Sequence, residues 1–466
     1  MEILSKISLI FDATTLLIIL TSTIVGVLIG ALPGLSSGMA IALLLPFTIY
    51  LEPSLAIASM AALYCGGTFG GSITAILINA PGAPPAAATA FDGFPMAQKG
   101  QAGKALGMAA VSSVVGGIIS LIVIFGLSML ASISAKSPLK NLIGGLIGLF
   151  VATIGVHLTT GVTRFTFNVG ALFDGVSFVP VLIGLFAMSE IFVQASKSEL
   201  LLERIKFSAI KLPSIGEFKN CIKTILRSSG IGTFIGILPA EGGTVSAMIG
   251  YNEARRWSKN KDNFGKGEIE GVAAPEAANN AATGGAMIPT LALGIPGSAT
   301  TAVILGGFQI HGLRAGPYLF EQQPDLLYII FYAMFLANFI FLIFGLMGAK
   351  IFSRISLIPR GFLWPSVFIF CLVGSYGLSQ SMVDVYIMLI SGAAGFFLRR
   401  SGFSPAPIIM GIVLGGLVEN SLAQSIIIFD QNLFMFFTRP IALTFFALTL
   451  LSLFYKPIKN LLMKGR

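Results

Sequence analysis

Residues 289–302 read PTLALGIPGSATTA and place a Pro-Gly pair, followed by three hydroxyl side chains, inside a long apolar region. Proline has no backbone N–H and glycine loosens a helix, so the pair predicts that a helix ends here. In hydrocarbon, the backbone groups freed by such an ending cost several kcal/mol unless protein, ions or water satisfy them. The partners of these groups therefore decide both the fold and the function of the chain.

The composition predicts a membrane protein. Of 466 residues, 55% are hydrophobic and 11% are charged, whereas a soluble domain has roughly 25% charged residues. Apolar runs of about 18 residues or more recur along the chain, and they predict an all-α polytopic protein with roughly eleven or twelve transmembrane segments. The net charge of +9 fits basic cytoplasmic loops better than nucleic-acid binding. The three cysteines are far apart in sequence, which predicts small buried side chains and no disulfide.

The opening stretch has a counterpart earlier in the chain. Residues 68–87 (TFGGSITAILINAPGAPPAA) match residues 283–302 (TGGAMIPTLALGIPGSATTA) at an offset of 215. Two further pairs occur in the same order: GALPGLSSG at 30–38 with GILPAEGGT at 236–244, and GVSFVPVLIG at 175–184 with GFSPAPIIMG at 402–411. These matches predict two homologous halves, 1–195 and 228–430. Between them lies a basic loop, 196–227, and after them an extra helix and basic tail, 431–466.

The positions of the charges predict that the two halves are inverted. Loop 196–227 carries seven Lys and Arg residues, which predicts a cytoplasmic loop. Residues 255–266, after the second LP motif, carry five cations, whereas the equivalent segment of the first half (FTIYLEP) has none. Equivalent loops with opposite charge bias indicate inverted topology. The N-terminus is then expected outside the cell membrane and the C-terminus in the cytoplasm.

Interrupted helices at matching positions of inverted repeats are a sequence indicator of a secondary transporter's binding site. Four breaks occur, at Pro33-Gly34, Pro81-Gly82, Pro239 with Gly242-Gly243, and Pro296-Gly297. A helix that begins at such a break presents free N–H groups and a positive dipole end to an anion. The alternative for a single break is a proline kink in a tightly packed helix. The candidate substrate-binding residues are Pro33, Gly34, Ser36, Ser37, Asn79, Pro81, Gly82, Pro296, Gly297, Ser298 and Thr300.

A second set of residues is a candidate for binding the coupling cation, Na⁺ or H⁺. Glu276, Asn279 and Asn280 lie in an apolar stretch and share one helical face, and an intramembrane carboxylate with amides is typical of an ion or proton site. The alternative is a helix-terminal glutamate at the membrane interface. Na⁺ is possible, but no ligand set is assigned to it. The full set of ion-coupling candidates is Thr68, Ser72, Thr74, Glu241, Gly243, Thr244, Glu276, Asn279 and Asn280.

Several other polar residues have simpler explanations. Asp92, in TAFDGFPMAQKG, is predicted to be a helix cap or turn residue at the cytoplasmic edge. Arg164 and Arg314 have the geometry to bind a substrate carboxylate, although anchoring at the interface is the preferred reading. His157 and His311 are too far apart in sequence to propose a metal pair.

Long blocks of the sequence resemble the large membrane subunit of the tripartite tricarboxylate transporters, the TctA family. The resemblance covers nearly the whole chain and rests on the following segments: GALPGLSSGMAIALLLP at 30–46, YCGGTFGGSITAILINAPGAPPAAATAFDGFPMAQKGQAGKALG at 64–107, GEIEGVAAPEAANNAATGGAMIPTLALGIPGSATTAV at 267–303, GLFAMSEIF at 184–192 and APIIMGIVLGGLVENSL at 406–422.

The resemblance implies a translocation subunit with two partners. These are a periplasmic solute-binding protein, which delivers a carboxylate, and a small four-helix membrane subunit. Uptake is coupled to a Na⁺ or H⁺ gradient. The resemblance also implies a bacterial inner membrane, with the N-terminus periplasmic. Two residues depart from the family pattern: Glu241, in LPAEGG, where glycine usually follows, and His157, where an acidic residue is expected.

These observations predict an importer of a small tricarboxylate or dicarboxylate, such as citrate, that works by alternating access and needs no cofactor beyond its coupling cation. A passive anion channel is the nearest alternative. An intramembrane hydrolase is a second one, but the sequence has no GxSxG motif and no His–Glu pairing to support it. The chain is therefore predicted not to be an enzyme.

Overall fold

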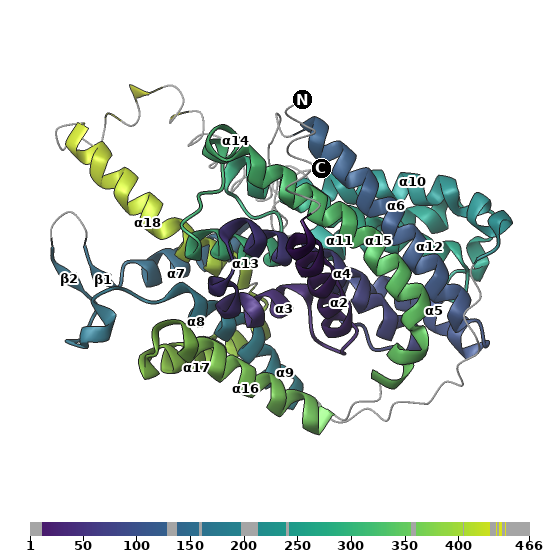
Figure 1. Cartoon of the computed structure of the whole chain (residues 1–466), viewed down its shortest axis with the longest axis horizontal. Helices are drawn as coiled ribbons and strands as arrows, with labels where there is room; N and C mark the ends of the chain where they lie inside the picture. The colour runs from purple at the N-terminus through teal and green to yellow at the C-terminus, as the bar shows by residue number, and fades with distance from the viewer. Residues whose placement is uncertain are drawn as a thin grey trace, which may run out of the picture. The chain divides into compact units, whose positions relative to one another are not determined.

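The structure, a computed structural model, describes residues 12–127, 138–157, 161–196, 213–238, 242–355, 360–403 and 405–428, with residues 435, 438, 439 and 443. Helices make up most of these residues (Figure 1), and the described strands form one short antiparallel pair, β1 and β2. The chain divides into two compact units, Met1–Ser134 with Val179–Phe397, and Ala135–Phe178 with Leu398–Arg466.

The first unit contains most of the helices. In chain order they are α2 (Ala13–Gly30), α3 (Ser37–Leu44), η1 (Leu45–Tyr50), α4 (Pro53–Ile78), η2 (Pro84–Ala86), α5 (Ala87–Gln98), α6 (Ala102–Leu127), α8 (Phe178–Ile183), η4 (Gly184–Met188), α9 (Ser189–Ala195), α10 (Ile215–Ile237), α11 (Gly242–Trp257), η5 (Lys261–Asn263), α12 (Glu270–Leu293), α13 (Ala299–Ile310), α14 (Pro317–Gln322), α15 (Pro324–Ile355), α16 (Arg360–Ser379) and α17 (Met382–Arg400).

The second unit is smaller and pairs two helices. It contains α7 (Pro138–Ala152), β1 (Gly155–Val156), β2 (Thr163–Arg164), η3 (Gly170–Leu172) and α18 (Pro405–Ile428). Helices α7 and α18 approach closely through glycine, because a β-carbon at Gly148 would lie 1.9 Å from the carbonyl oxygen of Ile408.

The membrane prediction is confirmed. Within the described residues, six helical segments are long and apolar enough to cross a bilayer: Ala13–Gly30, Pro53–Ile78, Ala102–Val123, Phe178–Ala195, Pro324–Met347 and Met382–Arg400. Shorter apolar helices, among them Ser37–Tyr50 and Ala299–Ile310, accompany them. The protein is therefore an all-α polytopic membrane protein, and a total of eleven or twelve spans remains a prediction.

The helices end where the sequence predicts breaks. Helix α4 ends at Asn79, which takes the left-handed conformation (φ 52°), and α12 ends at Gly294 in the same conformation (φ 69°). The residue after each cap donates its N–H back into the helix, Ala80 to the carbonyl of Thr74 and Ile295 to that of Pro289, both at 3.2 Å. All three pairs of equivalent residues are 215 positions apart, so the two helices end by the same hydrogen-bonded turn.

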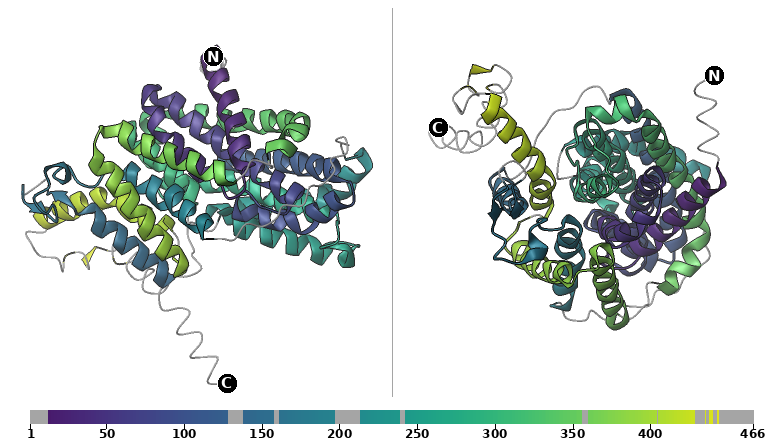
Figure 2. Two further views of the ribbon diagram at one scale, coloured as in Figure 1. Left: turned by 90° about the horizontal axis from the view of Figure 1, so that it is seen from below. Right: turned by 60° about the vertical axis from the view of Figure 1, so that its left-hand side comes forward.

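Helices α2 and α4 run in the same direction and touch backbone to backbone. A β-carbon at Gly66 would lie 2.4 Å from the carbonyl oxygen of Thr23, and one at Gly70 would lie 2.4 Å from that of Val27. Both contacts advance by four residues on each helix, which requires a parallel pair. The chain therefore turns back between them through α3 and η1. The purple helices stay together in both views of Figure 2.

Helices α10 and α12 repeat this packing in the second half. A β-carbon at Gly232 would lie 2.1 Å from the carbonyl oxygen of Ala278, and one at Gly236 would lie 2.7 Å from that of Ala282. Gly232 and Gly236 are the counterparts of Gly26 and Gly30 at the offset of 206. Small residues thus allow the same close helix contact in both halves.

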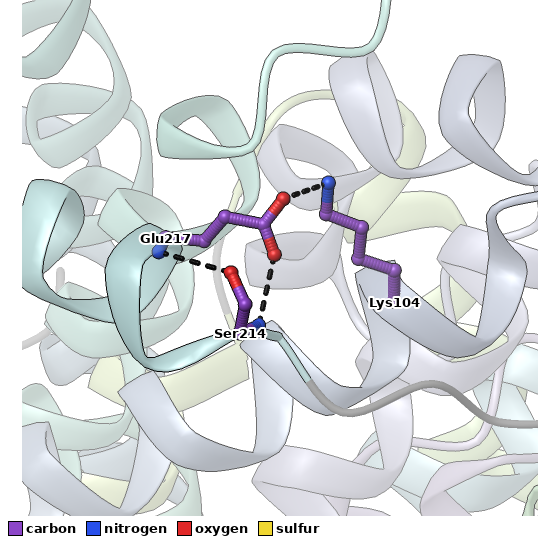
Figure 3. A network of polar contacts seen from close by, with 3 residues as sticks. All are labelled: Lys104, Ser214 and Glu217. Atoms are coloured by element: carbon purple, nitrogen blue, oxygen red, sulfur yellow. Dashed lines mark hydrogen bonds and ion pairs between the residues drawn. The ribbon is translucent and has the colours of Figure 1, made fainter.

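A polar cluster fixes the start of α10 against α6 (Figure 3). Ser214 and Glu217 form a capping box, in which the Ser214 N–H donates to Glu217 Oε2 at 2.9 Å and the Glu217 N–H donates to Ser214 Oγ at 3.3 Å. The other carboxylate oxygen of Glu217 pairs with the Lys104 ammonium of α6. This ammonium, together with the Ser214 hydrogen bonds, holds the pKa of Glu217 below its usual range.

We predict that Gly232→Val destabilises the protein by about 1–3 kcal/mol or more, because the added carbons overlap the α12 backbone. The matched control is Gly230→Val on the same helix, where a β-carbon meets nothing within 4 Å. Apparent unfolding temperatures of the purified proteins in detergent measure the difference. Equal temperatures for the two variants would contradict close packing of α10 on α12.

Candidate functional site

The N-termini of three helices meet at the predicted breaks. Ser37 at the start of α3 lies beside Thr300 at the start of α13, with their hydroxyl oxygens 3.4 Å apart. A β-carbon at Gly242, the first residue of α11, would lie 3.4 Å from Ser298 Cβ, directly before α13. The beginnings of α3, α11 and α13, which are far apart in sequence, are therefore neighbours in the first unit.

The segment after the remaining break, Pro81-Gly82, belongs to the same cluster. A β-carbon at Gly243 would lie 3.0 Å from the Pro85 ring in η2, so α11 also contacts the segment between α4 and α5. This contact is the counterpart of the one between α3 and α13, because Pro85 and Thr300 are 215 positions apart. The start of α3 in the first half thus lies against the segment after Pro296-Gly297 in the second half. The start of α11 in the second half lies against the segment after Pro81-Gly82 in the first half.

Serine side chains cap two of these helices. Ser36 accepts the Met39 N–H at 3.3 Å and so caps α3. Ser298 accepts the Thr301 N–H at 3.2 Å and donates its own N–H to Thr301 Oγ1 at 2.9 Å, which forms a reciprocal cap on α13. The Tyr64 hydroxyl of α4 lies 3.3 Å from Ser298 Oγ. The preceding N–H groups of each first turn have no partner within their helix.

The cluster has no fixed positive charge in its sequence segments, but it has other groups that favour an anion. Residues 30–38, 79–87, 236–244 and 294–302 contain no Lys or Arg. The positive ends of the helix dipoles, backbone N–H groups and hydroxyls favour a carboxylate. Binding of this kind is weaker than an arginine–carboxylate pair, which suits a ligand that has to be released.

The remaining candidate residues at the breaks contribute mainly through the path of the backbone, not through side chains that would bind a ligand. Gly34 has φ +86°, and a β-carbon there would lie 2.8 Å from Gln194 Nε2 of α9. Gly82 and Gly297 each allow close approach of their own break to the preceding helix, at Gly71 and Ala286 respectively. Pro33, Pro81 and Pro296 lie in the non-helical turns, and the Asn79 side chain is exposed.

The ion-coupling candidates separate into two places. Gly243 and the exposed Thr244 lie at the start of α11, beside the helix breaks. Thr68 and Ser72 of α4 donate their hydroxyls to carbonyls of their own helix, and Thr74 Oγ1 is buried without a hydrogen-bond partner among the described residues. Glu241, with Pro239, lies outside the described residues.

Glu276, Asn279 and Asn280 are buried inside α12, so the helix-terminal alternative for Glu276 does not hold. Their side chains are at most 3% exposed. A β-carbon at Gly243 would lie 2.6 Å from Asn279 Oδ1, which therefore faces the start of α11. Glu276 and Asn280 contact α5 and α6 instead. Within the described ranges, no group of His, Cys, Asp and Glu has the arrangement of a metal site.

Comparison with known proteins identifies the family. The model of the tripartite tricarboxylate transporter TctA family matches residues 16–125 and 121–410. The chain belongs to the TctA family. The segments quoted above for the resemblance lie almost entirely within these ranges.

Two relatives of this TctA-family protein come from Agrobacterium vitis. One is an uncharacterized 52.8 kDa protein in the TAR-I ttuC′ 3′ region, 33% identical over 481 residues that cover 97% of this chain and 95% of the relative. The other, an uncharacterized protein in the TAR-II ttuC′ 3′ region, is 37% identical over 219 residues, covering 47% of this chain and 90% of the relative. No solved structure matches the chain.

Asp92 of the TctA-family chain is neither a cap nor an exposed turn residue, so that prediction was wrong. It lies inside α5 and is completely buried. Its Oδ1 accepts the N–H groups of Gly265, Gly267 and Glu268, each at 2.8 Å, and its Oδ2 accepts the Tyr251 hydroxyl at 2.9 Å. Asp92 therefore fixes the connection between α11 and α12. Sequence spacing could not reveal this, because the contacts span more than 150 residues.

The two arginines have different surroundings. In the second unit, Arg164 Nη2 lies 2.6 Å and His157 Nε2 lies 3.0 Å from Glu419 Oε1 of α18. Arg164 thus has a protein carboxylate as its partner. The expectation that the chain has no His–Glu pairing was wrong, because His157 and Glu419, which are far apart in sequence, lie together. In the first unit, the exposed Arg314 lines an open pocket of about 420 Å³ with Tyr318 and Gln322 beside α14.

We predict that Asp92→Ala lowers the free energy of unfolding of this TctA-family protein by more than about 2 kcal/mol, because it leaves three backbone N–H groups and one hydroxyl without their acceptor. Tyr251→Phe removes one of these hydrogen bonds and is expected to cost about 0.5–1.5 kcal/mol. Thermal unfolding in detergent ranks the two variants. An Asp92→Ala variant no less stable than Tyr251→Phe would show that the carboxylate does not hold the loop.

Proposed function

We propose that this chain forms the translocation path of an ion-gradient-driven importer for a small organic anion. The observation that carries the proposal is the meeting of four helix breaks, two from each half, in a cluster of N-termini and hydroxyls without Lys or Arg. Such an arrangement binds a carboxylate by dipoles and hydrogen bonds. Membership of the family of a transporter component gives independent support.

The partners follow from the family's tripartite composition. A periplasmic solute-binding protein delivers the substrate, and a small four-helix membrane subunit completes the complex in the bacterial inner membrane. The two halves, 1–195 and 228–430, are inverted repeats that alternate access to the site. The N-terminus is periplasmic and the C-terminus cytoplasmic, as the basic loops indicate.

The substrate is a tricarboxylate or dicarboxylate. The family description supports tricarboxylates such as citrate. Tartrate serves as a representative dicarboxylate to test beside citrate. We propose no enzymatic activity, because the family is that of a transporter component.

Uptake by the reconstituted three-component complex tests the proposal. Proteoliposomes receive labelled citrate or tartrate with an imposed Na⁺ gradient, an imposed pH gradient, or neither. A coupled importer accumulates substrate above the external concentration only when a gradient is present. A passive anion channel equilibrates the substrate at the same rate after every gradient has been collapsed, and that result would contradict coupling.

We predict that Ser298→Ala raises the KM for uptake about tenfold, which corresponds to roughly 1.4 kcal/mol. The variant loses the α13 cap and one hydroxyl at the site. Ser120→Ala is the control, because its buried hydroxyl also bonds to protein but donates to the Gly117 carbonyl within α6. Equal KM values for both variants, with both folded, would place the substrate elsewhere.

A further inference from the structure

Glu276 lies at the centre of a cluster of hydroxyls from three neighbouring helices. The side chain is completely buried in α12. Its Oε1 accepts the Thr89 hydroxyl of α5 at 2.5 Å, and its Oε2 accepts the Ser113 hydroxyl of α6 at 2.9 Å. Ser72 of α4 is the third neighbouring hydroxyl. The carboxyl group is therefore surrounded by side chains that both donate and accept hydrogen bonds.

The direction of one of these hydrogen bonds is fixed. Asn280 Nδ2 lies 3.1 Å from the backbone carbonyl oxygen of Glu276, which can only accept, so a nitrogen has to face it. The same nitrogen donates to Ser113 Oγ at 2.8 Å. Ser113 then directs its own hydrogen to Glu276 Oε2. This leaves Oε1, which faces Thr89, as the oxygen that can take up a proton.

Ser72 can offer the carboxyl group either a hydrogen or a lone pair. Its hydroxyl lies beside the carboxyl group and within 2.6 Å of the Phe69 carbonyl oxygen, to which it can also donate. Because a hydroxyl rotates, it can donate to a carboxylate or accept from a carboxylic O–H. A Thr89 hydroxyl released by a protonated Glu276 can rotate and donate to a carbonyl of its own preceding turn. The cluster can thus accommodate both states of Glu276.

Asp92 has a contrasting set of donors. It is buried to the same extent, but three of its donors are backbone N–H groups. A backbone N–H can only donate a hydrogen bond, so it cannot reverse as a hydroxyl can. Glu276 receives hydroxyls in the same positions, and hydroxyls can reverse.

No charge compensates Glu276 within the described residues. The helices packed against α12 are α4, α5, α6, α10, α11, α13 and α14, and no side chain of theirs in the described part of the chain forms an ion pair with it. The titratable residues of these helices and of α12 itself are Tyr64, Cys65, Asp92, Lys104, Glu217, Lys219, Cys221, Lys223, Arg227, Tyr251, Glu253, Arg255, Arg256, Glu270, Tyr318 and Glu321. Asp92, one turn from Thr89, is engaged with its loop, and Lys104 pairs with Glu217.

The hydroxyl cluster is one helical turn from the anion site. Asn279, three residues after Glu276, has its Oδ1 against the start of α11 at Gly243. On the other side, the Pro85 ring packs against the same glycine, and Thr89 follows Pro85 by one turn. Changes at Glu276 can therefore reach the start of α11 through both α12 and the segment that begins α5.

We propose that the coupled ion is a proton and that Glu276 carries it. The Glu276 Oε1 atom takes up a proton from water on the side where substrate enters, which forms a neutral carboxylic acid, and gives it back to water on the other side. This inference rests on the proposed function, because it assigns the coupling ion of the same transport cycle. It requires no Na⁺, since the Asn280 amide presents its N–H₂ group to the cluster.

Uptake measurements with Glu276→Gln test the assignment. For the wild-type complex in proteoliposomes without Na⁺, we expect a pH gradient, acidic outside, to drive accumulation. Glu276→Gln, which resembles the neutral acid, is expected to lose gradient-driven accumulation at least tenfold and to retain exchange of labelled for unlabelled substrate within about twofold. Glu217→Gln, at the exposed capping box, is the matched control and should keep both activities.

Three results would overturn the proposal or separate it from the proposed function. Wild-type accumulation that follows a Na⁺ gradient and ignores pH would exclude the proton. Accumulation by Glu276→Gln at the wild-type rate would exclude this residue. A wild-type complex that neither accumulates nor exchanges any carboxylate would instead contradict the proposed function itself.

An infrared measurement keeps the test decisive if Glu276→Gln folds poorly. The neutral carboxyl C=O band of the wild-type protein should disappear as the pH rises and should show a shifted frequency in Ser113→Ala, which removes the donor to Oε2. A band that ignores pH, or that Ser113→Ala leaves unmoved, would show that Glu276 is not the proton carrier.

Discussion

The structure depends on one constraint: backbone N–H and C=O groups inside a membrane need partners within the protein or its ligands. Four helices begin or end at the sequence breaks of the first unit, and each of these termini frees such groups. Helices α4 and α12 satisfy their last carbonyls by the turn at Asn79 and Gly294, and α3 and α13 use Ser36 and Ser298 at their starts. What remains in the middle is a set of N–H groups from opposite halves of the sequence. The partner that we propose for them is an anion.

Close packing makes this arrangement possible. The parallel pairs α2–α4 and α10–α12 touch through backbone, which only glycine and alanine permit at these distances. Because the long helices of each pair run parallel, the chain has to turn back between them, through α3 in the first half and α11 in the second. The starts of α3 and α11 are thereby directed toward the second break of the other half. The high glycine content fits general helix packing, but here it also has a specific geometric result, which is the placement of the starts of α3 and α11.

The sequence predicted the features that depend on local chemistry and on the repeat. Pro81-Gly82 and Pro296-Gly297 mark real helix ends, and their offset of 215 recurs in the caps and in the contacts of Gly70 and Gly285. Contacts between segments that are far apart along the chain could not be predicted from the sequence. Nothing in TAFDGFPMAQKG indicates that Asp92 binds a loop more than 170 residues away. The sequence alone also does not explain why residue 271 is glycine; in the structure, a β-carbon at this position would lie 2.1 Å from Asp92 Oδ2. The hydroxyl groups around Glu276 were not predicted for the same reason, because no sequence spacing relates Thr89 or Ser113 to Glu276.

The repeat also shows what is not duplicated. The helix N-termini that we propose to bind the anion come from both halves at equivalent positions. Glu276 has no such counterpart, because position 61, 215 residues earlier, is alanine. A carboxylate in each half would place two buried negative charges near one anion, and their mutual repulsion would oppose binding. Under the proposed function, Glu276, next to Asn279 and the start of α11, adds one proton-dependent charge beside these N-termini. Binding of the anion and protonation of Glu276 then depend on each other.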